Sequence, residues 1–176
     1  MALMSRFAKD CRGVAAVEFA LIAPVMVLLY CGLVELSQAI IADSRTSHIA
    51  SAVGDLVAQT SAVTASDVDD IFAIGSTFMA PFPTSTLKMR VTSVTANASG
   101  TPMVDWSRGY NGFVALGAGS TVALPMTLTA GSSVVMSESQ YQYTSVIKYV
   151  LPNALTYNEK FYLTPRQSTQ VTCTGC

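Results

Sequence analysis

The stretch Val14-Ala-Ala-Val-Glu-Phe-Ala-Leu-Ile-Ala-Pro-Val-Met-Val-Leu-Leu-Tyr-Cys-Gly-Leu-Val34 decides how this chain is organised. As an α-helix it measures about 31 Å, at about 1.5 Å per residue, which matches the hydrocarbon thickness of a bilayer. Its single charged residue is Glu18. A carboxylate placed in lipid costs at least about 2.5 to 3.5 kcal/mol. The stretch therefore predicts a membrane span in which Glu18 needs a compensating partner.

The charges on either side of the span predict its orientation. The upstream segment is basic through Arg6, Lys9 and Arg12. The downstream segment begins with Glu35 and reaches its first basic residue only at Arg45. Basic flanks stay on the cytoplasmic side of a membrane, so we expect a cytoplasmic N-terminus and an exported remainder. The roughly 140 residues after the span are enough for one domain and too few for two ordinary ones.

The composition argues against several functional classes. A net charge of -1 and a charged fraction of 12% leave no basic face for nucleic acid. The one histidine, His48, lies on a predicted helix, and no Gly-x-Ser-x-Gly motif or convergent carboxylates follow, so we expect no enzyme and no small-molecule substrate. Asp67, Asp69 and Asp70 lack the glycine and distal Glu of a calcium loop, which favours helix N-terminal charges over a metal site. We expect no cofactor.

The span is predicted to continue as an amphipathic helix through residue 59. That segment contains no proline, and its large apolar residues recur at a helical spacing that requires a covering partner. They are Leu36, Ile40, Ile41, Ile49, Val53, Leu56 and Val57. Residues 60–65 are predicted as a loop, and Ser66 with Asp69 forms an approximate capping box for a second, short helix that ends near Met79.

The remaining residues predict strands. Residues 87–95 alternate between apolar and polar side chains, and a turn at 97–100 leads into residues 103–107, which indicates a hairpin. A glycine-rich loop at 109–120, a Val- and Tyr-rich strand at 133–146 and a last strand at 160–163 follow. We expect an α+β fold in which a small antiparallel sheet lays its apolar face on the long helix.

The residues at the start of the span resemble a known processing site. The sequence Gly13-Val14-Ala15-Ala16-Val17-Glu18-Phe19 is similar to that of type IV pilins, in which a membrane-embedded prepilin peptidase cuts after a glycine and the mature chain carries Glu fifth, followed by an aromatic residue. Counted from Val14, Glu18 is fifth and Phe19 is sixth. Cleavage would create an α-ammonium at the membrane face, and the Glu18 of a neighbouring subunit can pair with that cation.

Landmarks further along the chain extend the resemblance. They are Trp106-Ser107-Arg108, Leu124-Pro125, Tyr141-Gln142-Tyr143 and Leu163-Thr164-Pro165-Arg166 before a terminal cysteine. Together they resemble the TadE-like family of pseudopilins from tight-adherence pilus systems. The resemblance implies a pilin-like fold, a minor pilin that helps to initiate or support pilus assembly, and a location in the bacterial inner membrane with a periplasmic domain. The implied partners are the prepilin peptidase, other pilins and pseudopilins, and the inner-membrane platform of the pilus.

On this interpretation, residues 1–13 are a cytoplasmic leader, 14–34 the transmembrane helix, 35–80 a helical extracytoplasmic segment and 81–176 the sheet region of the same domain. Three alternatives stay open. The first is an uncleaved single-pass anchor of an adhesin or surface interaction protein, in which Glu18 snorkels or faces a partner helix. The second is a secretory signal cut after Ala39, although the apolar run is long for a signal core and carries an acid. The third concerns Cys173 and Cys176, which form either a terminal disulfide or two free thiols.

Overall fold

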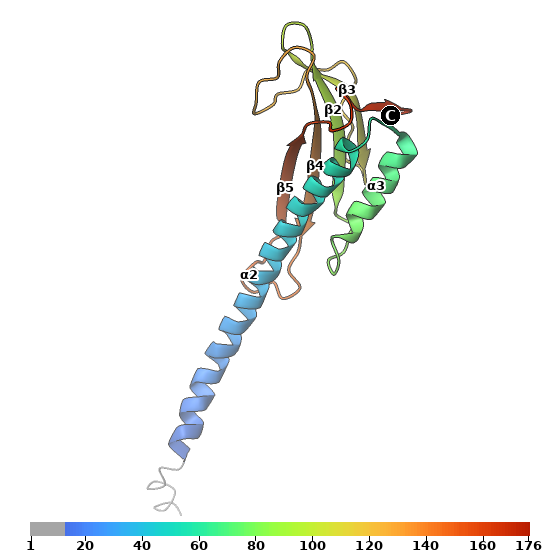
Figure 1. The fold of residues 1–176 in the computed structure, drawn as a ribbon. Coiled ribbons are helices and arrows are strands. Elements are labelled where there is room, and N and C mark those ends of the chain that lie inside the picture. Colours follow the sequence, from blue (N-terminus) through green and yellow to red (C-terminus); the bar gives the residue numbers. More distant parts are fainter. Residues whose placement is uncertain (1–12) are drawn as a thin grey trace, which may run out of the picture.

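A single helix carries the chain from its predicted processing site into the domain. The computed structural model describes residues 13–176, so the predicted leader lies almost entirely outside the described residues. Helix α2 (Val14–Ala58) runs continuously through Pro24 and measures about 67 Å at about 1.5 Å per residue. Its first half projects alone, and its second half lies along the sheet (Figure 1). The prediction of one helix that continues from an apolar segment into the domain is confirmed.

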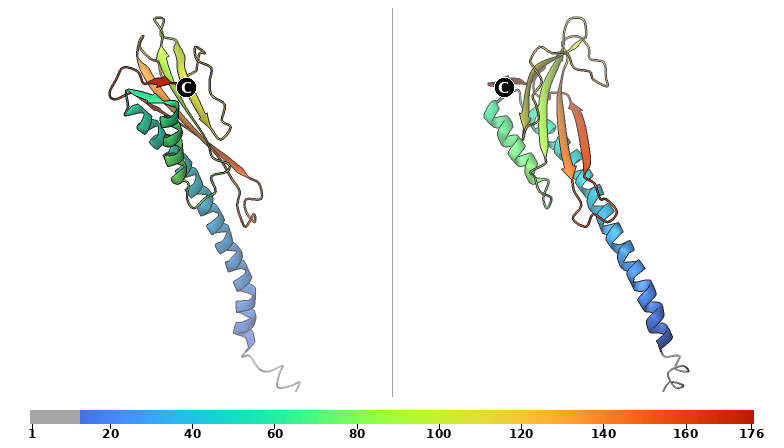
Figure 2. Two further views of the ribbon diagram at one scale, coloured as in Figure 1. Left: turned by 90° about the vertical axis from the view of Figure 1, so that its right-hand side faces the viewer. Right: turned by 180° about the vertical axis from the view of Figure 1, so that it is seen from behind.

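The sheet of the domain is four-stranded and antiparallel, in the order β3-β2-β4-β5. Its strands are β2 (Lys88–Ala96), β3 (Pro102–Tyr110), β4 (Ser133–Tyr143) and β5 (Leu155–Leu163). Helix α2 packs against β4 and β5, and helix α3 (Ala65–Thr77) lies beside α2 and contacts β3. The two helices thus cover one face of the sheet (Figure 2). The predicted α+β class, with a short second helix and a small antiparallel sheet, is confirmed.

Small residues, rather than the largest apolar ones, line much of the helix face that meets the sheet. The buried residues on α2 are Gly32, Glu35, Ala39, Ala42, Thr46, Ile49, Ala50, Val53, Gly54, Val57 and Ala58. The predicted stripe is therefore right for Ile49, Val53 and Val57. It is wrong for Leu36, Ile40 and Ile41, which stay exposed. Small side chains at this contact let the helix backbone approach the strands closely.

Gly54 marks the tightest point of this approach. A β-carbon placed on Gly54 would lie 2.6 Å from Leu163 Cδ1 and 2.8 Å from Ser137 Cβ, so no larger side chain fits without moving β4 or β5. About two helical turns earlier, the hydroxyl of Ser139 donates to the backbone oxygen of Thr46 over 2.7 Å. The second half of α2 therefore packs directly against β4 and β5.

We expect Gly54→Val to lower the free energy of unfolding of the domain by about 1 to 3 kcal/mol, the usual cost of overpacking a well-packed contact. The measurement is thermal or denaturant unfolding of the full chain in detergent. Ser44→Val is the matched control, because it places the same side chain at an exposed position of the same helix and should change stability little. Equal stability of the two variants would show that α2 is not seated on the strands at Gly54.

Helix α3 begins two residues earlier than its sequence signal suggested. The capping box is formed by Thr64 and Asp67, not by Ser66 and Asp69: the Thr64 backbone N–H donates to Asp67 Oδ2 over 2.8 Å, and the Asp67 N–H donates to Thr64 Oγ1. Asp69 instead pairs with Arg108 of β3, whose hydrogen bonds to it lower the pKa of the Asp69 carboxyl below its usual range. Asp67 is thus a charge in the first turn of α3, and Asp69 joins α3 to β3 through Arg108.

Two short strands were not predicted. β1 (Ala62–Thr64) occupies part of the segment expected to be a loop, and it pairs in parallel with β6 (Thr172–Thr174) near the C-terminus. The expected hairpin is present as β2 and β3, with β3 reaching Tyr110, and the last predicted strand is longer than expected because β5 begins at Leu155. The C-terminal segment is thereby tied to the residues that follow α2.

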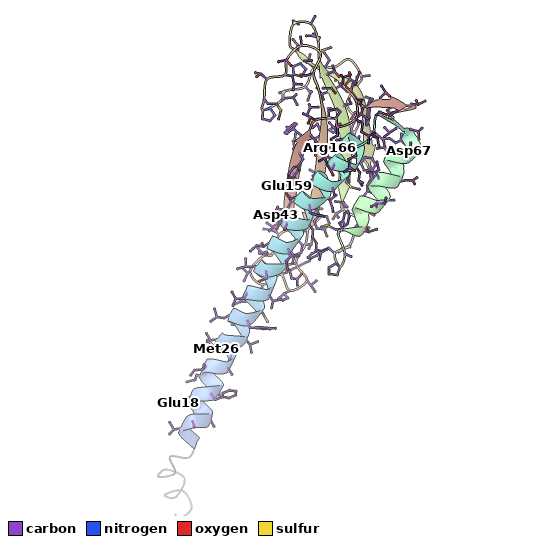
Figure 3. All side chains as sticks on the ribbon, viewed as in Figure 1. Glu18, Met26, Asp43, Asp67, Glu159 and Arg166 are labelled. Atoms are coloured by element: carbon purple, nitrogen blue, oxygen red, sulfur yellow. A yellow bond between two sulfur atoms is a disulfide. The ribbon has the colours of Figure 1, made fainter. Side chains whose placement is uncertain are left out.

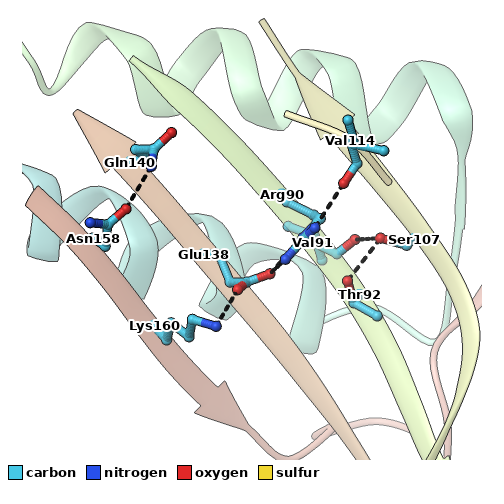
Figure 4. Close-up of polar contacts among 9 residues, drawn as sticks. All are labelled: Arg90, Val91, Thr92, Ser107, Val114, Glu138, Gln140, Asn158 and Lys160. Carbon is cyan, nitrogen blue, oxygen red and sulfur yellow. Dashed lines mark hydrogen bonds and ion pairs between the residues drawn. The ribbon is translucent and has the colours of Figure 1, made fainter. Parts of the chain in front are cut away.

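The sheet face away from the helices carries a cluster of paired polar side chains (Figure 4). The buried carboxylate of Glu138 accepts from Arg90 Nε over 2.6 Å and from Lys160 Nζ over 2.8 Å, so strands β2, β4 and β5 are joined across their outer surface. Arg90 also donates to the backbone oxygen of Val114 and lies over the ring of Phe113. This arrangement neutralises the one buried acid of that face.

Candidate functional site

The first part of α2, residues 14–34, exposes apolar side chains on all sides and is called the free half of α2 below. None of its most apolar 18-residue window is buried within the protein. Phe19 and Leu21 are 72% and 70% exposed, and the part of the helix that carries Glu18 and Met26 projects away from the sheet (Figure 3). A surface of this size and apolarity on one helix is stable only in lipid or against other helices.

Glu18 is the exposed acid of this free half. Its side chain makes no hydrogen bond or ion pair with any residue from 13 to 176. Glu35, the other acid near the span, is in the opposite situation, since it is 1% exposed and its Oε2 accepts from the backbone N–H of Val150 over 2.6 Å. One carboxylate oxygen of Glu35 is thus bound by the chain's own domain, whereas the Glu18 side chain makes no such contact within the described residues.

The predicted processing residues lie in succession where the described helix begins. Gly13 is the N-cap of α2 and makes no side-chain capping hydrogen bond. A β-carbon placed on Gly13 would meet no described atom within 4 Å, so packing within the domain does not require glycine there. Val14 and Phe19 are exposed on the following turns. Gly13 and Val14 are therefore exposed where the described helix begins, and cleavage between them stays a prediction.

The C-terminal cysteines are placed together. Cys173 and Cys176 are joined by a disulfide across a separation of three residues, and Cys173 lies in β6 beside β1. The other described cysteine, Cys31, is a free thiol in α2. Among residues 13–176, no cluster of His, Cys, Asp or Glu has the geometry of a metal site. The disulfide closes a small loop at the edge of the domain.

We expect the double variant Cys173→Ser, Cys176→Ser to fold and to lose less than about 2 kcal/mol in its free energy of unfolding, because a short loop removes little entropy from the unfolded chain. Thermal unfolding of the full chain in detergent, compared with the parent before and after reduction, measures the loss. A double variant that does not fold would contradict a peripheral role for this pair.

Sequence reasoning missed the contact between Glu35 and the loop that joins β4 and β5. The two groups are 115 residues apart in the sequence, and nothing in the local pattern of either segment indicates the other. The only signal in the sequence is that Glu35 directly follows the apolar stretch, and this pattern predicts an exposed residue beside the span. Glu35 is instead a structural residue at the junction of the free half of α2 and the domain.

Comparison with known proteins gives one family match. Neither the curated proteins nor the solved structures contain a match to the chain. The family model described as TadE-like protein matches residues 13–55, a segment that starts at the predicted processing glycine and covers nearly all of α2. The TadE-like family is one of structural, pilin-like proteins of tight-adherence pili. The match confirms the resemblance seen in the sequence, and it is confined to Gly13 and helix α2.

Proposed function

We propose that this chain is a minor pilin or pseudopilin of a tight-adherence type IV pilus, cleaved after Gly13 by a prepilin peptidase and needed to initiate or support filament assembly. The observation that carries the proposal is the free half of α2, an apolar helix with an unpaired acid close to its start. Such a helix serves two environments in turn, because the same apolar surface that dissolves in a bilayer can pack against other helices once it leaves the bilayer.

Glu18 makes specific the packing of this helix against other helices after it leaves the bilayer. Cleavage after Gly13 turns the Val14 nitrogen into an ammonium one helical turn from Glu18, since residues four apart are neighbours on a helix. The ammonium of the same chain then offsets part of the cost of holding the carboxylate in lipid, and a neighbour's ammonium replaces it in the assembled helix bundle. The apolar surface supplies affinity, and the ion pair selects the axial register between subunits.

The proposal also assigns location, boundaries and partners. Residues 1–13 are the cytoplasmic leader, 14–34 span the inner membrane once, and residues 35–80 and 81–176 form one periplasmic domain. The partners are the prepilin peptidase, other pilins and pseudopilins, and the inner-membrane platform. The basic upstream flank and the single apolar segment support this topology.

Pilus yield in a strain that lacks this chain tests the proposed function. We expect surface pili, sheared from cells and quantified by the major pilin, to fall to near background and to return when the full chain is supplied. The processing of the major pilin should be unchanged in the same cells. Undiminished pili in the deletion strain, together with reduced attachment to a surface, would instead support the alternative of a membrane-anchored adhesin.

A further inference from the structure

The loop that joins β4 and β5, residues 144–154, exposes a cluster of apolar side chains at the end of the domain nearest the free half of α2 (Figures 1 and 2). The exposed members are Val146 at 97%, Tyr149 at 57%, Ile147 at 46% and Val150 at 42%. Lys148 between them is exposed too. Apolar side chains gathered on one exposed loop indicate contact with a partner surface.

This loop is anchored to the helix. Val150 donates its backbone N–H to the buried carboxylate of Glu35, and its side chain lies 3.1 Å from the position that a β-carbon on Gly32 would take. Ser145 is buried, and its hydroxyl oxygen accepts from the N–H of Lys148. Leu151 packs on the core. The loop is thus fixed at both ends while the residues between its anchors face outward.

A groove of about 390 Å³ lies between the loop and the helix. It is lined by Val25, Leu28, Leu29, Gly32, Leu33, Leu36, Tyr149 and Val150. Most of these residues belong to the predicted span, so whatever covers the span also reaches the loop. At about 1.5 Å per residue, Gly32 lies about 27 Å along the helix from Val14. The hydrocarbon core is about 30 Å thick, so this end of the groove falls at its outer boundary.

We infer that the β4–β5 loop docks on the outer leaflet of the bilayer and seats the domain on the membrane before assembly. The chemistry of the loop fits the headgroup boundary: tyrosine rings concentrate at this depth, and a lysine can extend its charge toward the phosphates while its stem lies along apolar groups. Glu35 is the positioning residue, because its hydrogen bond holds Val150 against the helix. This inference requires the membrane span and not the assembly step of the proposed function.

Depth-dependent quenching of a tryptophan at position 149 tests the inference. Tyr149→Trp in the full chain is reconstituted into phosphatidylethanolamine and phosphatidylglycerol vesicles that carry bromine either near the carbonyl end or near the methyl end of the acyl chains. We expect a blue-shifted emission and loss of most of the added fluorescence, with carbonyl-end bromine quenching more strongly. The native Trp106 is buried in the domain and supplies the parent's background signal.

Met126→Trp is the matched control. Met126 is 44% exposed, and Leu128, two residues on, lies beside Gly100 in the turn between β2 and β3, at the opposite end of the sheet from the loop. We expect this variant to be quenched no more than the parent. Equal quenching at positions 149 and 126 in protein that floats with the vesicles would overturn the inference while leaving the membrane anchor in place. Stronger quenching by methyl-end bromine would also overturn it, because the loop would then lie in the membrane interior.

Discussion

We expect the Gly13→Val chain to remain at precursor length in cells that process the parent chain. A peptidase that cuts at the membrane face must bring its catalytic groups close to the backbone, and only a very small side chain permits that approach. The structure gives no folding role to this glycine, since a β-carbon there meets no described atom within 4 Å. A block of cleavage would therefore report recognition by the peptidase and not misfolding of the substrate.

Two control variants sharpen this prediction. Gly13→Ala adds a single methyl group and should be processed more slowly than the parent but faster than Gly13→Val. A substitution in the same helix but away from the site, such as Met26→Leu, should be processed like the parent, because Met26 is an exposed residue of the free half of α2. Immunoblots that separate precursor from mature chain give the ratio for each variant. Normal processing of Gly13→Val would remove the main support for the pilin interpretation.

The second large effect is expected from Glu18→Gln, which should give stable, membrane-inserted and cleaved protein that does not support piliation. The amide keeps the shape of the side chain and much of its hydrogen bonding but removes the charge that pairs with an ammonium. It should enter the bilayer more easily than the parent, because an amide costs less in lipid than a carboxylate. No described residue pairs with Glu18, so the substitution breaks no contact within the domain.

The measurement is surface pilus yield at matched protein level, with cleavage after Gly13 scored in the same cells. Glu18→Asp is the control for charge, since it keeps a carboxylate on a shorter side chain and should retain part of the yield. Glu35→Gln changes an acid of the same helix that is bonded within the domain, and its effect should appear in domain stability. Normal pili from cleaved Glu18→Gln protein would mean that the carboxylate is not needed for pilus assembly.

The sequence predicted the elements whose signals are local. The apolar stretch and the proline-free segment after it predicted one helix to residue 59, and the helix ends at Ala58. The alternation before and after the turn at 97–100 predicted the β2–β3 hairpin. Each of these signals lies within one element or two adjacent ones, where side-chain periodicity directly reflects which face is buried.

Contacts between distant segments were not predictable in this way. The β1–β6 pair joins two strands of three residues that are 110 positions apart in register, as Ala62 opposite Thr172 shows, and strands so short carry no periodicity. The buried face of α2 was misjudged at Ile40 and Ile41 because the prediction weighted large apolar residues. The sheet instead selects the face whose small residues, Gly54 among them, allow the closest approach.

The sequence predicted the residues of the candidate site but not the contacts that the fold makes around them. Gly13, Val14, Glu18 and Phe19 follow from a short motif, and the role assigned to them stays a prediction until cleavage is measured. What the structure adds is the difference between the two acids of the helix: Glu35 is bound by the β4–β5 loop, and Glu18 is not bound by any described residue. This contrast depends on a contact across the fold and is invisible in the sequence alone.

The intact mass of the chain purified from membranes tests the central claim most directly, because that claim requires cleavage between Gly13 and Val14. We predict a mass equal to residues 14–176 with Cys173 and Cys176 oxidised, with or without one small addition at the new N-terminus, and fragmentation that places Val14 first. A strain without the prepilin peptidase should yield the mass of the whole chain. A chain that retains residues 1–13 in peptidase-proficient cells, or one that begins after Ala39, would contradict the account.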